Sequence, residues 1–507
     1  MNRQFLNPGK RPLQIMKFGG TSVGDAPSIH KVVEIIRHAS RATDLAVVVS
    51  AMSGVTDQLV EAATQSEAGN GDAVETIFKR LRERHHAVLT ALIHSAPSRS
   101  RISAEAEKVF HEGERLCQGT ALLRELTLRA RDSISSLGER LSAPLVAAVL
   151  AESEVASEAI DATDLIQTDS CHGAADPCMD RTRERCQRRL HPLLRKGVVP
   201  VVTGFIGATA EGVLTTLGRG GSDYSATILG AALDADEIFI WTDVDGMMTA
   251  DPRLVPDACT IEEISYRESA ELAHFGAKVL HPKTLRAVTQ CGIPLWIRNT
   301  FAPERAGTKI TSAAPSNAGG VKGLTAIRDV ALITVGGPGM AGVPDVLGRT
   351  FATTAAVRAN ILLISQSSSQ NDICLVVSSA HASATVEALR REFTPDLAHE
   401  KVEHVRLDST VSMVTVVGQN MRGSEVVGRT FGALGRAGVN VIAIVQGSSE
   451  CNLSFVVSRA DMRAALVTTH REFQLGAVNA KAASEAASAA SPAAWCCEPE
   501  RPYVDAD

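Results

Sequence analysis

The sequence predicts an α/β protein, in which a first part built on a largely parallel sheet precedes two small ferredoxin-like units. Two observations lead to this prediction. Up to about residue 300, short apolar runs alternate with stretches of helical periodicity. Runs that are apolar throughout are typical of strands buried on both faces of a parallel sheet. After residue 320 a pattern of strands and helices occurs twice, which indicates an internal duplication.

The first part is expected to span residues 13–305. Its clearest predicted strands are residues 46–50, 200–203 and 238–241, and residues 57–150 are predominantly helical in pattern. A connector rich in Pro and Gly follows over residues 301–320, where a new unit is expected to begin.

The second part is expected to span residues 321–475, as two units of about 321–400 and 408–475. Residues 345–351 (DVLGRTF) recur as residues 425–431 (EVVGRTF). Each copy predicts strand, helix, strand, strand, which is typical of a ferredoxin-like βαββαβ unit. The Ala- and Ser-rich tail, residues 476–507, lacks periodic apolar positions and is predicted to be disordered.

Composition excludes several classes of function. The chain of 507 residues has a net charge of −6 and only 4% aromatic residues, which disfavours a nucleic-acid partner. No apolar run is long enough to predict a membrane span, and residues 1–14 show no apolar signal segment. Ten scattered cysteines suit reduced thiols, so we expect a cytoplasmic protein.

Several cysteines and histidines lie close together in the sequence. Their spacing matches no two-plus-two arrangement of zinc ligands, so we expect ordinary cysteines and no metal site. These residues are Cys171, His172, Cys178, Cys186 and His191.

The most informative motif is Lys17-Phe18-Gly19-Gly20-Thr21-Ser22. It follows a short apolar run and precedes a helical pattern, which predicts a strand, a Gly-rich turn and a helix N-terminus. Such a turn directs backbone N–H groups and the helix dipole toward an anion. Glycines allow close backbone approach, and the lysine adds a positive charge.

Three further motifs lie at predicted element boundaries: residues 215–223 (TTLGRGGSD), 241–246 (WTDVDG) and 275–282 (FGAKVLHP). Together the four motifs supply Gly-rich turns, cationic side chains and carboxylates. Phosphoryl transfer needs these parts, because its catalysis depends mainly on positioning and on charge neutralisation.

In this order, the four motifs resemble those of the aspartate kinases of the amino-acid kinase superfamily, over roughly residues 13–475. The resemblance implies a three-layer amino-acid-kinase fold and the phosphorylation of the side-chain carboxylate of L-aspartate by ATP and Mg²⁺. That reaction opens the route to lysine, threonine and methionine. Mg²⁺ is expected to bind largely through ATP phosphates, as is usual for this ion.

The resemblance also implies roles for individual residues. Lys17, Arg219 and Asp223 are the expected catalytic residues, with Arg219 suited to grip the substrate's α-carboxylate. Further substrate contacts are expected from Ser50, Thr56, Glu139 and Ser222. The expected nucleotide contacts are Lys17, Gly19, Gly20, Thr242, Asp243, Met248, Arg253 and Lys278. Many relatives have an aromatic residue near this position, where this chain has Met247 and Met248.

The duplicated part resembles the paired ACT domains of aspartate kinases, and its Gln-Ser-Ser-Ser and Gln-Gly-Ser-Ser segments resemble those of bifunctional aspartate kinase–homoserine dehydrogenases. Gln366 and Gln446 are the expected allosteric residues, with threonine as the favoured inhibitor and lysine as the runner-up. We expect the two units to pack edge to edge, and a homodimer or larger assembly to complete the sites. The chain ends at Asp507, so we expect no fused dehydrogenase.

Two alternatives stay open at this point. One is another acylphosphate-forming kinase, such as a glutamate or N-acetylglutamate kinase. The other is an amino-acid sensor with a catalytically silent kinase part. The presence of Lys17, Glu139, Arg219 and Asp223 argues against the second alternative.

Overall fold

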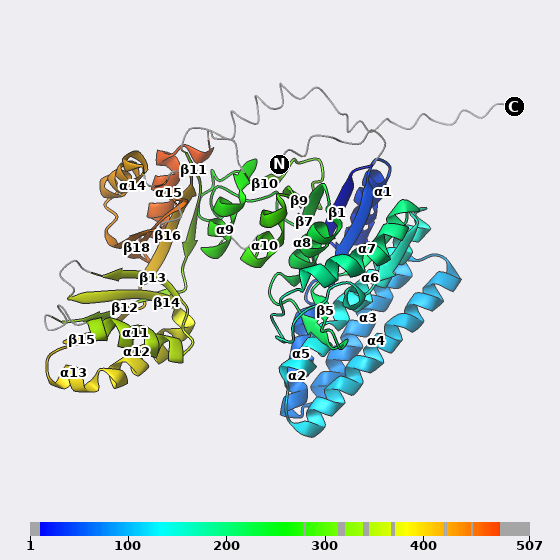
Figure 1. Ribbon diagram of the computed structural model, residues 1–507, viewed down its shortest axis with the longest axis horizontal. Helices are drawn as coiled ribbons and strands as arrows, with labels where there is room; N and C mark the ends of the chain where they lie inside the picture. The colour runs from blue at the N-terminus through cyan, green and yellow to red at the C-terminus, as the bar shows by residue number, and fades with distance from the viewer. Residues whose placement is uncertain are drawn as a thin grey trace.

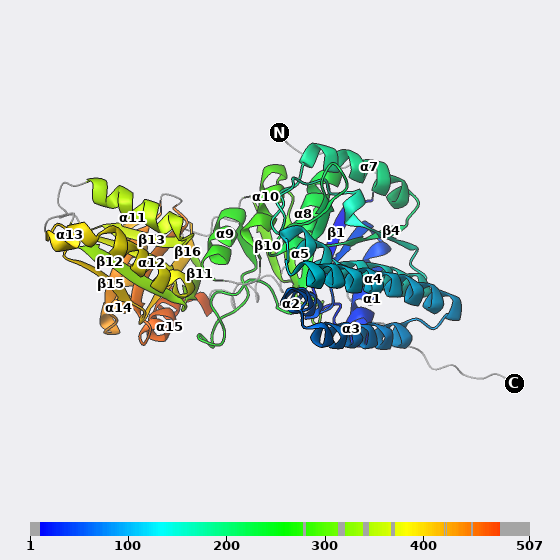
Figure 2. The same ribbon diagram turned by 90° about the horizontal axis from the view of Figure 1, so that it is seen from below.

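The computed structural model describes residues 11–276, 280–312, 320–337, 344–366, 371–419, 421, 423–447 and 450–476. Figure 1 shows two parts joined through α9 (Tyr266–His274) and β10 (Thr308–Thr311). One part contains the large sheet and most of the helices, and the other contains two small sheets with their own helices. Figure 2 shows the same separation from a second direction.

The large part is built on an eight-stranded sheet with the order β3-β4-β2-β1-β7-β9-β10-β8. Its strand pairs are parallel except that of β9 with β10. The strands are β1 (Leu13–Phe18), β2 (Asp44–Val49), β3 (Ser157–Ile160), β4 (Val199–Thr203), β7 (Glu237–Thr242), β8 (Glu263–Ser265), β9 (Leu295–Asn299) and β10. A separate hairpin is formed by β5 (Ile206–Ala208) and β6 (Leu214–Thr216).

Helices cover both faces of this sheet, because side chains along each strand alternate between two apolar cores. Met16 and Phe18 pack in one core, and Ile15 packs in the other. The first face is covered by α1 (Ala26–Ser40), α2 (Val55–Ala68), α3 (Gly71–Leu92), α4 (Ala96–Leu123), α5 (Leu128–Ser135) and α6 (Leu137–Glu152). The second is covered by α7 (Met179–Arg195), α8 (Gly221–Leu233) and α10 (Pro282–Cys291), with the short helix η1 (Ala162–Asp164) nearby. The predicted three-layer α/β fold is confirmed.

The small part contains two repeats of the same architecture. In the first repeat, the sheet order is β13-β14-β12-β15, formed by β12 (Val330–Gly336), β13 (Ile361–Gln366), β14 (Asp372–Ser378) and β15 (His404–Asp408). Its helices are α11 (Pro344–Ala356), α12 (Ser379–Glu392) and α13 (Thr394–Ala398). The expected βαββαβ pattern is confirmed here.

In the second repeat, the sheet order is β11-β16-β18-β17, formed by β11 (Val321–Ile327), β16 (Val411–Gly418), β17 (Val441–Gln446) and β18 (Asn452–Ser458). Its helices are α14 (Ser424–Arg436) and α15 (Met462–Glu472). Because β11 precedes the first repeat in sequence, the first repeat is an insertion in the second. The expected division, which placed residues 321–327 in the first unit, is therefore corrected.

The two repeats contact each other through the faces of their sheets. Leu332 and Leu363 of the first repeat share one apolar cluster with Met413 and Val456 of the second. Each repeat has its own separate sheet. The expected edge-to-edge packing of the two units is therefore wrong within this chain.

One helical stretch of the described residues, Leu128–Glu152, passes a membrane-span test on length and composition, and 83% of the tested window is buried inside the fold. A core helix passes the same test, so this finding is weak support for a membrane span.

Candidate active site

Lys17 and Asp223 form an ion pair between the end of β1 and the start of α8. Lys17 lies near the C-terminal end of β1, and Asp223 lies in the first turn of α8. Their Nζ and Oδ1 atoms are 2.6 Å apart, with side chains that are 10% and 14% exposed. The structure therefore joins the first and second Gly-rich motifs by an ion pair with little exposure to solvent.

The first Gly-rich turn packs closely around this lysine. The Gly19 N–H donates to the Trp241 carbonyl at the end of the neighbouring strand β7 (3.1 Å). A Cβ atom at Gly19 would lie 3.4 Å from Lys17 Nζ, and one at Gly20 would lie 3.0 Å from the Ala51 carbonyl oxygen. A side chain at Gly19 would crowd the lysine ammonium, and one at Gly20 would crowd the backbone that follows β2.

The second Gly-rich turn presents Arg219 on an exposed bend. Gly218 and Gly220 have φ of +81° and +71°, in the left-handed region that favours glycine. A Cβ atom at Gly218 would lie 2.9 Å from the Gly173 carbonyl oxygen, and one at Gly220 would lie 2.6 Å from His281 Cβ. The turn is thus enclosed by the loop around Gly173 and by the start of α10.

His281 is a neighbour of this turn that the sequence did not identify as a site residue. Burial lowers the pKa of His281, and the nearby charges of Lys283 and Arg219 lower it further, whereas Asp223 raises it. His281 therefore lies within electrostatic range of both Arg219 and Asp223, and its neutral form is favoured near pH 7. Its position in the motif at residues 275–282 was the available sequence clue.

Glu139 is a buried carboxyl group in the first turn of α6, with 3% exposure. It accepts a hydrogen bond from the Ala51 backbone, while its Oε2 atom is buried with no partner among the described residues. Burial raises the pKa of Glu139 to about 8, although the positive charge of Lys17 acts in the opposite direction. A carboxyl oxygen of this kind is costly unless a bound cation satisfies it.

The expected hydroxyl residues lie at the end of β2 and at the starts of α2 and α8. Ser50 follows β2 directly, and its N–H donates to the Phe18 carbonyl (3.1 Å). Thr56 lies in the first turn of α2, and Ser222 lies beside Asp223 in α8. A Cβ atom at Gly204 would lie 2.7 Å from Ser222 Cβ. Because Gly204 has no side chain, Ser222 can pack against the end of β4.

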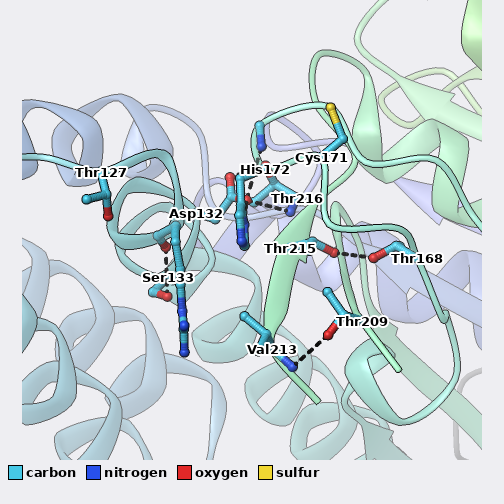
Figure 3. A network of polar contacts seen from close by, with 12 residues as sticks. Thr127, Asp132, Ser133, Thr168, Cys171, His172, Thr209, Val213, Thr215 and Thr216 are labelled. Carbon is cyan, nitrogen blue, oxygen red and sulfur yellow. Dashed lines mark hydrogen bonds and ion pairs between the residues drawn. The ribbon is translucent and has the colours of Figure 1, made fainter. Parts of the chain in front are cut away.

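Asp132 is a second buried carboxyl group, and no sequence motif pointed to it. Its Oδ1 accepts from the Thr216 hydroxyl (2.6 Å), and its Oδ2 lies 2.8 Å from His172 Nδ1 and accepts from the backbone N–H groups of Gly173 (3.0 Å) and Thr216 (3.2 Å). Figure 3 shows Asp132 between His172 and Thr216. Asp132 therefore ties α5 to β6 and to the loop that borders Gly218, on the side where the chain enters the Arg219 turn.

The expected nucleotide residues are only partly brought together. Thr242 and Asp243 lie at the C-terminal end of β7, beside the first Gly-rich turn, at the edge where ligands bind in open α/β sheets. Met248 lies farther along this segment, in a bridge with Thr260. Arg253 is 86% exposed and pairs with Asp251 (2.7 Å).

Arg253 belongs to a segment that packs away from Lys17. Its neighbours Ala250 and Val255 lie in the apolar core of the second repeat. Within the described parts of the chain, the side chain of Arg253 forms hydrogen bonds and an ion pair with Asp251 and none with the Lys17 group. Lys278 lies outside the described residues.

The cysteines considered as metal ligands do not form a cluster. Cys171 and Cys178 are exposed, whereas Cys186 is buried in the core beneath α7. His172 is engaged by Asp132. Across the described ranges, no group of three or more His, Cys, Asp or Glu side chains is arranged to hold a metal ion.

Comparison with known families identifies both parts of the chain. The Amino acid kinase family model matches residues 12–299, and the ACT domain model matches residues 333–393 and 414–473. The chain therefore belongs to the amino acid kinase family.

Similar sequences narrow this class to the aspartokinases. The chain is 34% identical over 468 residues to bifunctional aspartokinase/homoserine dehydrogenase 1, chloroplastic, of Arabidopsis thaliana, covering 91% of this chain and 51% of that protein. It is 31% identical over 466 residues to aspartokinase 1, chloroplastic, of the same plant, covering 90% and 80%. The chain spans about half the length of the bifunctional relatives that it matches.

Solved structures agree with this grouping. The complex of E. coli aspartokinase III with aspartate and ADP matches with a TM-score of 0.75 and 29% identity, covering 91% of this chain and 99% of that one. Clostridium acetobutylicum aspartate kinase matches with a TM-score of 0.76 and 25% identity, covering 91% and 100%.

Proposed function

We propose that the chain is an aspartate kinase, which transfers the γ-phosphoryl group of ATP to the side-chain carboxylate of L-aspartate and forms 4-phospho-L-aspartate. This is the first step of the biosynthesis of lysine, threonine and methionine. The observation that carries the proposal is the Lys17–Asp223 pair beside Glu139, a buried carboxyl group with an open acceptor. The E. coli relative solved with aspartate and ADP supports it.

In the proposed reaction, an oxygen of the substrate carboxylate forms a bond to the γ-phosphorus, and the bond from that phosphorus to the β-phosphate oxygen breaks. The attacking carboxylate is already ionised at neutral pH, so no general base is needed. Lys17 neutralises the charge of the transferring group, and Asp223 orients Lys17 through their 2.6 Å contact.

The remaining groups of aspartate require their own partners. The open Oε2 atom of Glu139 suits the substrate ammonium. The exposed guanidinium of Arg219 suits the α-carboxylate, which it can bind with two parallel hydrogen bonds. Ser50, Thr56 and Ser222 are proposed to complete the aspartate pocket.

The phosphate donor is proposed to bind where β1 and β7 end. Gly19 and Gly20 are proposed to line the phosphates, with Thr242 and Asp243 beside them. Met248, Arg253 and Lys278 are the further proposed nucleotide contacts. Mg²⁺ suits this site when it is held mainly by ATP phosphates, where it neutralises phosphate charge, since it seldom uses an all-protein cage.

An assay of ADP release tests this proposal against the two alternatives. Aspartate should support ADP release, whereas glutamate and N-acetylglutamate should not. Turnover with glutamate in place of aspartate would favour another acylphosphate-forming kinase. No turnover with any of the three would favour a silent sensor.

Two substitutions separate the proposed roles. Lys17→Ala should lower kcat by about 100- to 1,000-fold, because the lysine acts on charge that develops in the transition state. Arg219→Ala should instead raise the KM for aspartate by about 30-fold or more, because it contacts a group remote from the reacting atom. Full activity of Lys17→Ala, or an unchanged aspartate KM in Arg219→Ala, would contradict these assignments.

We further propose end-product regulation through the repeats, with threonine as the favoured inhibitor and lysine as the runner-up. E. coli aspartokinase III, which has been solved with lysine and aspartate, supports an amino-acid effector. Gln366 and Gln446 are the proposed effector contacts. Ser367, Ser368 and Ser369 next to Gln366, and Ser448 and Ser449 next to Gln446, lie outside the described residues.

A homodimer or larger assembly is proposed through the repeats. Ile364 and Ile444 occupy equivalent positions on the edge strands β13 and β17, and they are 44% and 46% exposed. Exposed apolar edge strands favour pairing with another chain. Residues 13–305 are proposed as the catalytic domain and residues 321–475 as the regulatory part. A cytoplasmic location is proposed because ten cysteines scattered along the sequence suit reduced thiols.

A further inference from the structure

Arg84 of α3 joins two segments that border the proposed active site. Its Nη1 atom donates to the Ser53 carbonyl (2.7 Å), and its Nη2 atom donates to the Gly24 carbonyl (2.9 Å). Gly24 lies just after the first Gly-rich turn, and Ser53 lies in the loop between β2 and α2. A guanidinium holds its N–H groups in a rigid planar fork, so the two bonds fix these carbonyls relative to each other.

The helix that carries Arg84 is anchored in the core of the large part. Phe78, Leu81 and Val88 are buried on one side of α3. Arg84 lies three residues after Leu81 and four residues before Val88, which places it along the same side of the helix. The side chain of Arg84 is half-buried there. Its guanidinium is therefore supported by a packed helix, which positions a group more precisely than a loop does.

The two segments also contact each other directly. The Ser53 N–H donates to the Gly20 carbonyl (2.9 Å). A Cβ atom at Gly24 would lie 3.6 Å from Ser53 Cβ. Ser53 is thus bonded to the Gly-rich turn through its N–H group and to Arg84 through its carbonyl. Arg84 adds the bond that joins the outer end of this contact to the residue that follows the turn.

The charge of Arg84 acts on the start of α1 as well. Asp25 is the N-cap of α1, and its side chain accepts from the Ser28 N–H (2.9 Å). Hydrogen bonding from Ser28 lowers the pKa of Asp25, burial raises it, and the positive charge of Arg84 lowers it further. Arg84 therefore lies within electrostatic range of the residue that begins the helix after the turn.

The two segments present different parts of the proposed site. The turn begins beside Lys17, which is proposed to act on the transferring phosphoryl group. The loop begins at Ser50 and leads to Thr56 in the first turn of α2. Its Ala51 backbone N–H donates to Glu139, the proposed partner of the substrate ammonium. Arg84 therefore joins the phosphate side of the site to the amino-acid side.

We propose that Arg84 is a positioning residue for phosphoryl transfer, which fixes the phosphate donor on the turn relative to the acceptor carboxylate beside the loop. This inference rests on the proposed kinase function. The reacting oxygen and the γ-phosphorus must be aligned, and a misplacement of about 1 Å can cost about 100-fold in rate. Both partners of Arg84 are backbone carbonyls, so it acts through the two segments, each of which keeps its own binding groups.

Steady-state kinetics of Arg84→Ala test this, with Arg80→Ala as a matched control at an exposed position of the same helix. Arg84→Ala should lower kcat by about 10- to 100-fold, because alignment of the two substrates is lost. The KM values for ATP and aspartate should change by less than about threefold, because the groups that bind each substrate remain. Arg80→Ala should have the kinetics of the wild type.

Arg84→Lys separates the fork from the charge. The lysine keeps the positive charge but lacks the planar pair of donors, so its kcat should stay about fivefold or more below that of the wild type.

Hydrogen exchange followed by mass spectrometry examines the same contact without turnover. In Arg84→Ala, peptides that contain residues 19–24 and 51–55 should exchange about threefold faster or more, because local opening of both segments becomes easier. Peptides of α7, which covers the opposite face of the sheet, should be unchanged. A general loss of stability would instead speed exchange in α7 as well.

Four results would overturn the proposal: an unchanged kcat in Arg84→Ala, a rise in either KM that exceeds the fall in kcat, wild-type kcat in Arg84→Lys, or exchange that is unchanged in both segments or faster throughout the large part. Absence of aspartate-dependent ADP release in the wild type would refute the proposed kinase function and with it a role for Arg84 in that reaction. The exchange measurement would then still decide whether Arg84 holds the two segments together.

Discussion

Asp132 and Glu139 are both buried carboxyl groups, on the consecutive helices α5 and α6, but their surroundings differ. Asp132 has close polar contacts to both of its oxygens, from Thr216, Gly173 and His172. Glu139 keeps one oxygen without a partner among the described residues, and burial raises its pKa to about 8. Asp132 adjoins the Arg219 turn through Gly173, whereas Glu139 lies within electrostatic range of Lys17.

The comparison separates a carboxylate whose two oxygens both have partners within the fold from one that keeps an open acceptor. A buried carboxylate with all its acceptors used stabilises the segments that donate to it. A buried carboxyl group with an open acceptor weakens the free protein and is stabilised when a cation binds. We therefore expect substitution of Glu139 to affect substrate binding, and substitution of Asp132 to affect stability first.

The largest effect is expected from Glu139→Gln. Loss of the ammonium partner should raise the KM for aspartate by about 100-fold, because removing one member of a buried charge pair typically costs about 2–5 kcal/mol. The free energy of unfolding should be unchanged or higher, since the substitution removes a desolvated carboxyl group. Steady-state kinetics and urea unfolding measure the two quantities.

Asp132→Asn should show the opposite pattern. The amide places a donor opposite existing donors, so we expect the free energy of unfolding to fall by about 2–3 kcal/mol. The KM for aspartate should rise by about tenfold through displacement of the Arg219 turn, with kcat within about threefold of the wild type. Asp176→Asn is the matched control, because its partners Lys283 and Arg286 bind it near the surface.

A stable Asp132→Asn protein with wild-type KM would show that this network does not position the turn. Thr216→Val separates the two roles further, because it removes one donor and keeps the carboxylate. It should reproduce the KM change with a smaller loss of stability.

The smallest effect is in the pH dependence. If the ammonium of aspartate binds the ionised form of Glu139, as proposed, binding at pH 7 should release close to one proton, and affinity should fall about tenfold per pH unit below 8. Calorimetry in buffers of different ionisation enthalpy measures this proton, which should be absent in Glu139→Gln. Proton uptake on binding would contradict the account.

The same pKa shift has a consequence for stability in the absence of substrate. In the unfolded chain Glu139 ionises near pH 4.5, whereas in the folded protein it keeps its proton to about pH 8. Its contribution therefore becomes increasingly unfavourable to folding as the pH rises from 4.5 to 8. Glu139→Gln should lose this component of the pH dependence of unfolding.

Sequence patterns predicted the large sheet well, because its uninterrupted apolar runs and Gly-rich turns are local features. Lys17 and Asp223 were both expected as catalytic residues because both lie in recognisable motifs, and the structure brings them into contact. Asp132 was missed because it lies in none of the four motifs, and because its partners His172 and Thr216 are remote from it in sequence. Such contacts depend on tertiary packing that no local pattern records.

The duplication shows the same limit. Its repeated segments predicted two similar units, but β11 pairs with β16 of the second repeat across the whole first repeat. The packing of α9 on the second repeat could likewise not be predicted from the sequence, because Asn452 and Glu271 come into contact only in the folded chain. Internal similarity predicts the architecture of each repeat. It does not predict which other part of the chain packs on the sheet of each repeat.

The most direct test compares aspartate with succinate, which lacks the ammonium group, in the wild type and in Glu139→Gln. If aspartate is the substrate and Glu139 binds its ammonium group, the wild type should release ADP with a kcat/KM at least 100-fold higher for aspartate than for succinate. Glu139→Gln should reduce this preference to about tenfold or less. Absence of aspartate-dependent ADP release in the wild type, or an undiminished preference in the variant, would contradict the account.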